Sequence, residues 1–464
     1  MSKRRSPIGF KESLLILLMI LIVMGVSVIG LKISPEVPIL ISIMLVIAWI
    51  KVRGTSWNRI DQGFIRGIKN GIVPMLIFIL IGSLIGVWIA AGIIPSLMVF
   101  GFHLISIRWF LPSAFIVTAI VGSVIGSAFT VISTLGVAFM GMGLTMHIDP
   151  AMVAGAVLYG AIFGDKSSPL SATDNLSAAV VGADLIDHIK NLMWSTIPAL
   201  ISTFAIFCFI GGGASHVSLR RVDSVISVLE SHFSITAWAI VPIGLLFVCA
   251  WGHIPTVSTL FINILVSSVM LAIEHPHFGL AKWDYVIVNG FKSTTGNQTV
   301  DTLLSRGGIM SMMSTLSLVI IALALGGLLM HLGIIDAAMR PVTKRLHGTG
   351  SLITAVIASG IGVNLFIGEQ YLSVILPANA FAKVFQQHRL APVALSRALE
   401  DGGTVINYLV PWGVAGAFVA NALNVPTLHY LPFVFFSLLS PVFSIISGFT
   451  GIGIKHLKSG RSKA

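Results

Sequence analysis

The sequence predicts an all-α polytopic membrane protein that contains inverted repeats with broken or re-entrant helices. Of its 464 residues, 56% are apolar and only 10% are charged, whereas a soluble domain carries about 25% charged residues. Several apolar runs, such as residues 72–91, reach the roughly 20 residues that a helix needs to cross a bilayer. A pattern of glycines and prolines also occurs twice along the chain. The composition excludes a soluble enzyme.

The first apolar run, residues 13–33, follows a short basic arm. A secretory signal peptide has an apolar core of only about 7–15 residues, so we expect this run to remain as a transmembrane helix. A second run at 37–50 leads into a connector, 51–70, that contains five Lys or Arg residues. Residues 1–63 are therefore interpreted as N-terminal transmembrane helices with a basic connector.

The rest of the chain alternates between apolar segments and polar interruptions, and we expect about eleven or twelve membrane segments in total. A soluble loop is predicted at 213–233. The interruptions divide the chain into four further parts: a first repeat at 64–189, linking transmembrane helices and loops at 190–304, a second repeat at 305–424, and a C-terminal helix with a basic tail at 425–464.

Matching positions indicate the repeat. Gly92 corresponds to Gly333, and Pro169 corresponds to Pro411, at a separation along the chain that is larger by a single position. Two further prolines, Pro150 and Pro392, precede Pro169 and Pro411 by the same number of residues. Similar positions that recur in order at a fixed spacing are the sequence signature of a duplicated unit.

One part of the alignment uses a different spacing. We match Gly126 with Gly362, which are closer in sequence than the other pairs, and so expect a longer loop in the second copy. At this shorter spacing the alignment pairs Glu369 with Ser133 and Gln370 with Thr134. At the spacing of the two prolines it pairs Asp165 with Asn407.

The connectors predict how the two copies are oriented. In the first copy the basic connector 51–70 precedes the apolar segment, and connector 92–108 after it has only one basic residue. In the second copy connector 287–308 has two basic residues and connector 340–345 has three. Because basic loops face the cytoplasm, the copies should have opposite topology, with both termini cytoplasmic. Inverted repeats of this kind are typical of secondary transporters.

Other functional classes lack support. The net charge of +11 comes mostly from residues between the apolar runs and at the ends, which fits cytoplasmic anchoring and not nucleic-acid binding. The sequence has no phosphate-binding loop of an ATP-driven pump. Cys208 and Cys249 lack the spacing of a metal site. We expect no cofactor and no enzymatic nucleophile–base pair.

Each copy contains a polar interruption that could bind an ion. In the first, Pro169 breaks a helix and frees backbone carbonyls, and charged residues at membrane depth are functional by default. The candidates in the first copy are Asp165, Lys166, Ser168, Ser171, Thr173, Asp174 and Asn175. Those in the second are Asn364, Glu369, Gln370, Asp401, Thr404 and Asn407. For Arg397 and Glu400, an ordinary interhelical salt bridge is an equal alternative.

Four stretches together resemble the NhaC-type sodium/proton antiporter family. They are Phe163-Gly-Asp-Lys-Ser-Ser-Pro-Leu-Ser171, Leu303-Leu-Ser-Arg-Gly-Gly-Ile-Met-Ser-Met-Met313, Gly368-Glu-Gln-Tyr-Leu-Ser373 and Ser396-Arg-Ala-Leu-Glu-Asp-Gly-Gly-Thr404. The resemblance implies inverted repeats with broken helices and exchange of cytoplasmic sodium for external protons. The same motifs fit the related sodium-coupled malate/lactate antiporters.

The chain departs from the family pattern inside the predicted site. The family has an acidic residue at the position of Ala172, and here the nearest one is Asp174. It also has Asp where Glu369 stands, and a Ser-Pro pair where Asn407-Tyr408 stands. These changes leave transport as the prediction and the transported cation or co-substrate open.

The predicted function is a secondary antiporter of the bacterial cytoplasmic membrane whose partners are Na⁺, H⁺ and the lipid bilayer. Asp165 or Asp174 would bind either Na⁺ or H⁺, with oxygens of neighbouring side chains completing the site. The alternative is exchange of a small organic acid, malate or lactate, bound by Lys166 or Arg397. A homodimer is considered, and no nucleic acid is expected.

Overall fold

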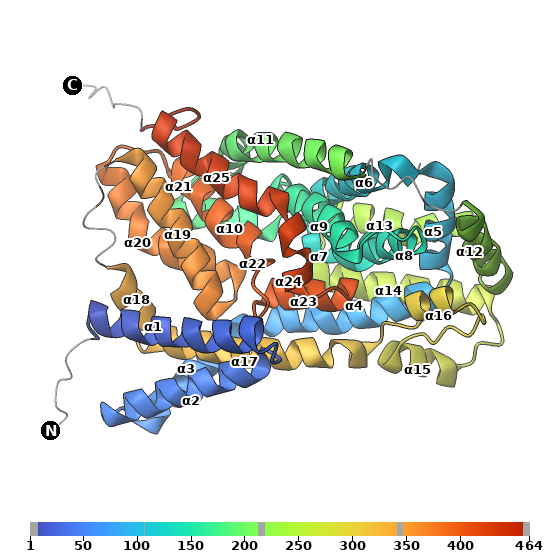
Figure 1. The fold of residues 1–464 in the computed structure, drawn as a ribbon, viewed down its shortest axis with the longest axis horizontal. Coiled ribbons are helices and arrows are strands. Elements are labelled where there is room, and N and C mark those ends of the chain that lie inside the picture. Colours follow the sequence, from blue (N-terminus) through green and yellow to red (C-terminus); the bar gives the residue numbers. More distant parts are fainter. Residues whose placement is uncertain (1–7, 106, 212–218, 341–345, 347, 458–464) are drawn as a thin grey trace.

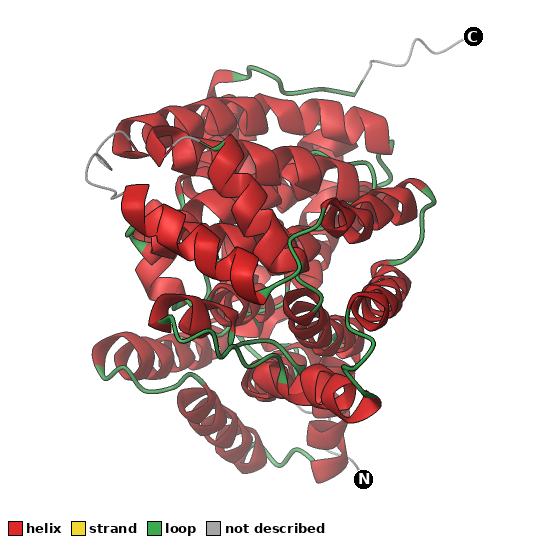
Figure 2. Cartoon of the chain, turned by 90° about the vertical axis from the view of Figure 1, so that its right-hand side faces the viewer, coloured by secondary structure: helices red, strands yellow, loops and turns green. Residues whose placement is uncertain are grey.

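The computed structural model describes residues 8–105, 107–211, 219–340, 346 and 348–457. Within these ranges the chain is helical, apart from one isolated bridge between Leu390 and His456. The helices form one elongated bundle, seen from the side in Figure 1 and along its long axis in Figure 2, and both views show helices throughout it. The all-α prediction is confirmed. The basic arm before residue 8, most of connector 340–345 and the last residues of the basic tail lie outside the described residues.

Seven helices of the described chain are long and apolar enough to cross a membrane, and the number rises to nine if two bent pairs each count as one span. This is fewer than the eleven or twelve segments predicted. The difference arises because several apolar helices are shorter than a membrane span, such as Ile93–Leu104, Phe110–Ile125 and Val414–Leu423. The two bent pairs confirm the prediction of broken segments. Counting helices by length alone includes only the unbroken spans.

The first part of the chain forms eleven α-helices. They are α1 (Phe10–Met24, continued by a π-helix at Gly25–Gly30), α2 (Glu36–Val52), α3 (Trp57–Asn70), α4 (Ile72–Ala90), α5 (Ile93–Leu104), α6 (Phe110–Ile125), α7 (Ala128–Val131, followed by a π-helix at Ile132–Gly136), α8 (Val137–Thr145), α9 (Pro150–Lys166), α10 (Ala172–Val181) and α11 (Leu185–Gly211). The predicted basic connector is thus largely helix α3.

The middle of the chain differs from the prediction of a soluble loop at 213–233. Its described part is the helix α12 (Leu219–His232), which buries Val222, Val225 and Leu229 on one side. The spacing of these residues by three and four is that of an amphipathic helix packed on a protein surface. The helices that follow are α13 (Ile240–Trp251), α14 (Thr256–Glu274), α15 (Leu280–Asn289) and α16 (Gln298–Leu304). In Figure 1, α12 to α16 gather at the end of the bundle opposite α1 and α2.

The last part resembles the first in its order of elements. It contains α17 (Met313–His331), α18 (Ile334–Met339), α19 (Thr349–Ile367), α20 (Gln370–Gln387), α21 (Pro392–Leu399, continued by a π-helix at Glu400–Thr404), α22 (Val405–Asn407), α23 (Val414–Leu423), α24 (Thr427–Tyr430) and α25 (Phe435–Thr450). Both ends of α17 follow those of α4 at the spacing that relates Gly92 to Gly333. Both ends of α23 follow those of α10 at the spacing that relates Pro169 to Pro411.

The helix ends correct one part of the sequence alignment. Helix α6 ends at Gly126 with φ of 69°, and α19 ends at Gly368 with φ of 71°. Both glycines adopt the left-handed conformation that terminates a helix at little steric cost. Gly362, which we had matched with Gly126, lies inside α19 and has no such role. Gly126 and Gly368 have the same spacing as the two prolines, so no longer loop is needed.

Two close contacts between glycines correspond to one another. Each contact joins the first part of the chain to the last, and each glycine of one contact has its counterpart in the opposite part in the other contact. A Cβ atom on Gly327 would lie 2.5 Å from the backbone nitrogen of Gly67, so α17 and α3 can meet only through glycine. Likewise, a Cβ atom on Gly86 would lie 3.3 Å from the backbone nitrogen of Gly308. Gly308 is the counterpart of Gly67, and Gly327 is the counterpart of Gly86, both at one constant spacing. Contacts exchanged in this way are those of a two-fold arrangement.

Candidate ion-binding site

The break between α9 and α10 is held open by its own side chains. Helix α9 ends at Lys166, and α10 begins at Ala172. The hydroxyl of Ser171 accepts a hydrogen bond from the backbone N–H of Asp174 over 3.4 Å and so caps α10. The side-chain amide of Asn175 donates to the carbonyls of Pro169, 2.9 Å away, and Ser171, 2.7 Å away. The proline prevents a continuous helix, and the caps fix the break.

A second break lies between α19 and α20, and Glu369 caps it. Its Oε2 accepts a hydrogen bond from the backbone N–H of Leu372 over 2.8 Å. Ser127, which directly follows Gly126 as Glu369 follows Gly368, caps α7 in the same way. It accepts from the backbone N–H of Thr130 over 3.4 Å. The structural counterpart of Glu369 is therefore Ser127, and its pairing with Ser133 was wrong.

Two asparagines connect the broken segments of the second part. The Asn407 amide donates to Asn364 Oδ1 over 2.7 Å, and Asn407 Oδ1 accepts from the backbone N–H of Ala415 over 3.0 Å. The Asn364 amide donates to the carbonyl of Gly403 over 2.5 Å. Gly403 belongs to the π-helix at Glu400–Thr404, whose extra residue per turn changes the direction of the side chains that follow. The asparagines thereby hold the end of α19 against the end of α22 and the start of α23.

A cavity of about 630 Å³, the first cavity, reaches both breaks. Asp165 at the end of α9 and Glu369 at the start of α20 both line it, so each part of the chain contributes one carboxylate. Asp165 also faces the hydroxyl of Ser171 and the backbone N–H of Ala128. The other predicted residues that line the cavity are Thr173, Asn175, Gln370 and Asn407.

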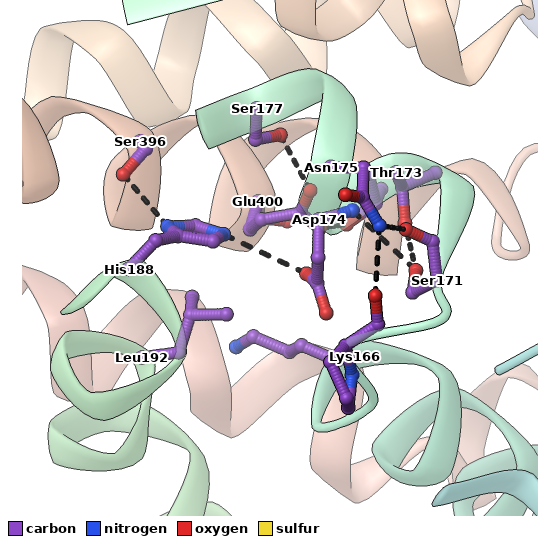
Figure 3. A network of polar contacts seen from close by, with 12 residues as sticks. Lys166, Ser171, Thr173, Asp174, Asn175, Ser177, His188, Leu192, Ser396 and Glu400 are labelled. Carbon is purple, nitrogen blue, oxygen red and sulfur yellow. Dashed lines mark hydrogen bonds and ion pairs between the residues drawn. The ribbon is translucent and has the colours of Figure 1, made fainter. Parts of the chain in front are cut away.

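A second group of titratable side chains does not line the cavity. Figure 3 shows this group and its polar contacts. Asp174, His188 and Glu400 are buried, and each offers a ligand atom within 4.8 Å of the others. His188 Nε2 lies 3.7 Å from Asp174 Oδ1, and its Nδ1 lies 2.7 Å from the hydroxyl of Ser396. Neither carboxylate oxygen of Asp174 has a hydrogen-bond partner in the described chain.

Glu400 has partners. It accepts hydrogen bonds from the hydroxyls of Ser177 and Thr404. Within the described chain it forms no ion pair with Arg397, whose guanidinium donates to the hydroxyl of Ser447 over 2.8 Å and to the carbonyl of Gly453 over 3.4 Å. The structure therefore supports neither alternative for Arg397 and gives it a third role, in which it ties α21 to the end of α25.

Lys166 is neutralised by a buried acid. Its ammonium forms an ion pair with Asp401 and a hydrogen bond of 2.6 Å with the hydroxyl of Ser440. Ser440 in turn donates to Asp401 over 2.6 Å. The Lys166 and Asp401 side chains are 2% and 0% exposed, and neither lines the first cavity. The cationic side chain that we expected to bind an organic acid is therefore already paired inside the protein.

The structure thus separates the thirteen predicted residues into groups. Six line the first cavity, and Asp174, Lys166, Asp401 and Thr404 lie in the buried groups that do not line it. Ser168, Ser171 and Asn364 bind backbone at the breaks. Sequence reasoning missed Ser127, which the correct glycine alignment would have revealed. It also missed His188, for which no spacing gave a signal.

Comparisons with known proteins identify the family of the chain. The profile of the Na⁺/H⁺ antiporter family matches residues 160–452. The chain belongs to this family. The Na⁺/H⁺ antiporter NhaC of Alkalihalophilus pseudofirmus is 39% identical over 461 residues, which cover 99% of each chain. NhaC of Bacillus subtilis is 38% identical over 421 residues, covering 90% of this chain and 93% of the relative.

A relative whose name gives different substrates is more distant. The malate-2H⁺/Na⁺-lactate antiporter of Bacillus subtilis is 31% identical over 456 residues, covering 96% of this chain and 97% of the relative. The resemblance to the NhaC-type family is confirmed, and the chain is a multi-pass membrane protein of a transporter family. The matched region contains both breaks and every predicted site residue.

Proposed function

We propose that this antiporter-family protein exchanges Na⁺ for H⁺ across the bacterial cytoplasmic membrane, and that Asp165 and Glu369 are the carboxylates that face the ion. The observation that carries the proposal is the first cavity, which brings these two acids from separate parts of the chain to one space. Hydroxyl and amide oxygens of Thr173 and Asn175 line the same space. Oxygen donors of this kind suit a hard cation such as Na⁺.

Exchange follows from competition for the same oxygens. A protonated carboxylate has lost the charge that attracts Na⁺. A carboxylate that binds Na⁺ is stabilised in its ionised form, which disfavours protonation. If access to the acids alternates between the two sides, each side delivers one ion and removes the other. Asp174 is the second candidate carrier, because its oxygens are buried without hydrogen-bond partners in the described chain.

The proposed orientation follows from charge. We place α3, the connector at 340–345 and both termini in the cytoplasm because these segments are basic. Asp187, on the first turns of α11, lies 3.5 Å from Lys455 of the C-terminal segment. Leu185, on the same turn, lines the first cavity. Under this topology the first cavity opens towards the cytoplasm, and the two parts of the chain form inverted repeats.

An organic acid as substrate is the less favoured proposal. A carboxylate ligand would need a cationic side chain that faces the cavity. Lys166 is paired with Asp401, Arg397 is bound to Ser447, and neither lines the cavity. The homodimer that we considered stays a prediction.

The test is transport by the purified full-length protein in sealed vesicles. We expect an imposed Na⁺ gradient to drive proton movement that a pH-sensitive dye reports, with Li⁺ and K⁺ compared in turn. Vesicles without protein give the background. If malate or lactate gradients drive proton movement and Na⁺ alone does not, sodium/proton exchange is the wrong assignment.

A further inference from the structure

The described chain contains a second cavity of about 680 Å³, built from the counterparts of residues that line the first. On one wall, Val73, Pro74 and Ile77 of α4 line the first cavity. Their counterparts on α17, at the spacing that relates the ends of these two helices, line the second; they are Ser314, Thr315 and Leu318. Two cavities of unrelated origin would not select the same three positions of two corresponding helices.

The opposite walls also correspond. Pro169, Asn175 and Leu185 line the first cavity. Their counterparts, at the spacing that relates α10 to α23, line the second; they are Pro411, Ala417 and Thr427. The two cavities therefore lie between corresponding elements. The first lies between α4 and the segment that leads into α10, and the second lies between α17 and the segment that leads into α23.

Each cavity is bordered by the turn of a helical hairpin, and the two turns share their geometry. Lys32, between α1 and α2, and His253, between α13 and α14, have φ of 55° and 56°, a left-handed conformation that is rare outside glycine. Each turn ends at a proline, Pro35 or Pro255, which precedes the first residue of the next helix. Lys32 and Pro35 line the second cavity, and His253 and Pro255 line the first. The correspondence thus extends to the hairpins.

We propose that the second cavity is the entry site through which Na⁺ or H⁺ reaches Asp165 and Glu369 from the opposite side of the membrane. The inference rests on the proposed exchange function. The exchanged glycine contacts relate the two parts by a two-fold arrangement, which places corresponding cavities on opposite sides of the axis. A two-fold axis in the membrane plane makes these sides the two membrane faces.

The entry site is closed in this structure. The first cavity reaches Asp165 and Glu369, whereas the second reaches neither. Asn175, on the wall of the first cavity, is exposed, and its counterpart Ala417 is 7% exposed. The same exposed and buried pairing holds for Ala172 and its counterpart Val414.

Trp412 has the position of a plug. Its counterpart in the first part is Leu170, which is partly buried and lines the first cavity. Trp412 is 8% exposed, packs in one apolar cluster with Leu318 and Ala417, and donates from Nε1 to the carbonyl of Leu365 over 2.7 Å. Opening requires the indole to leave this cluster and to break the hydrogen bond.

The lining of the second cavity has polar groups, which include the ammonium group of Lys32 as well as one carboxylate. Among the described residues that line the second cavity, Glu36 is the only carboxylate, and Asn421 and Asn424 add amide groups. The hydroxyl of Ser34 donates to Glu36 and fixes it at the start of α2. In the proposed pathway an ion enters among these polar groups, and the apolar cluster that contains Leu318, Trp412 and Ala417 blocks it in the closed state.

Single cysteines at corresponding positions test the proposal in full-length protein that carries Cys208→Ser and Cys249→Ser. Ile77→Cys reports on the first cavity and Leu318→Cys on the second. Ser314→Cys, one turn from Leu318 and already exposed, is the matched control. A membrane-impermeant thiol reagent is added to either face of oriented vesicles while Na⁺ is varied on each side.

We expect Ile77→Cys and Leu318→Cys to react from opposite faces, with rates that change in opposite directions by about tenfold as the Na⁺ gradient is reversed. Ser314→Cys should react at a steady rate from the same face as Leu318→Cys. Reaction of both inner positions from one face, or a Leu318→Cys rate that ignores the gradient, overturns the inference. Sodium/proton exchange measured in the same vesicles before labelling shows whether the proposed function itself has failed.

Discussion

Replacing Lys166 by Met should destabilise the protein far more than replacing both members of its ion pair. The Lys166 and Asp401 side chains are 2% and 0% exposed, so the pair is shielded from water. In Lys166→Met protein, Asp401 would keep the hydroxyl of Ser440 on Oδ1, and its Oδ2 has no hydrogen-bond partner in the described chain. Leaving one charge of a buried pair without its partner costs about 3–5 kcal/mol.

The double variant separates the charge from the packing. Replacing a buried ion pair by apolar residues of similar volume is often neutral or stabilising, so Lys166→Met with Asp401→Leu should recover most of the stability. If the ion pair between Lys166 and Asp401 positions the break between α9 and α10, neither variant should exchange ions normally. Lys383→Met is the control, since Lys383 is exposed and surface changes usually stay within about 0.5 kcal/mol.

Thermal and denaturant unfolding of the purified variants in detergent measures the difference. We expect the free energy of unfolding to decrease from wild type to the double variant and then to Lys166→Met, which should be well below the other two. A Lys166→Met protein within about 0.5 kcal/mol of wild type would refute it. That result would mean that Asp401 is solvated or protonated and that Lys166 does not stabilise it.

Three further outcomes follow from the proposed site and topology. Asp165→Asn protein should insert and fold but lose exchange, whereas Lys383→Ala protein should retain it; normal exchange by well-expressed Asp165→Asn protein would transfer the role to another acid. The apparent Na⁺ affinity should weaken as pH falls, by about tenfold per unit once the carboxylate is mostly protonated, because the proton occupies the same oxygens; an affinity independent of pH in vesicles argues against direct competition. Reporter fusions at Arg53 and Lys344 should both be cytoplasmic, and opposite sides would contradict the inverted topology.

Local chemistry made the breaks predictable. Pro169 lacks a backbone donor and interrupts an apolar segment, so a break at this position needs no tertiary information. The cluster of polar residues around it pointed to the same place. The amphipathic helix α12 was missed because its charged residues outweigh the three apolar ones that it buries.

Tertiary contacts account for the remaining errors. Gly126 was aligned with Gly362 because a helix-ending glycine and a helix-internal glycine look the same in one sequence, and only φ separates them. His188 reaches Asp174 from α11 across a contact that no local pattern encodes. The pairing of Lys166 with Asp401 likewise joins two distant parts of the sequence. Each of these depends on how the two parts of the chain pack.

The corresponding positions share a scaffold but not a chemistry. Asp165 corresponds to Asn407, and Glu369 corresponds to Ser127, so at each pair one part supplies an acid and the other a neutral group. Asn407 is already bound to Asn364 and to the backbone of Ala415, which leaves it little capacity for an ion. A duplicated fold therefore holds two acids in one cavity and not two equivalent sites. Under the proposed function this single pair of acids is loaded from either face, so Na⁺ and H⁺ compete for the same oxygens and their movements are coupled.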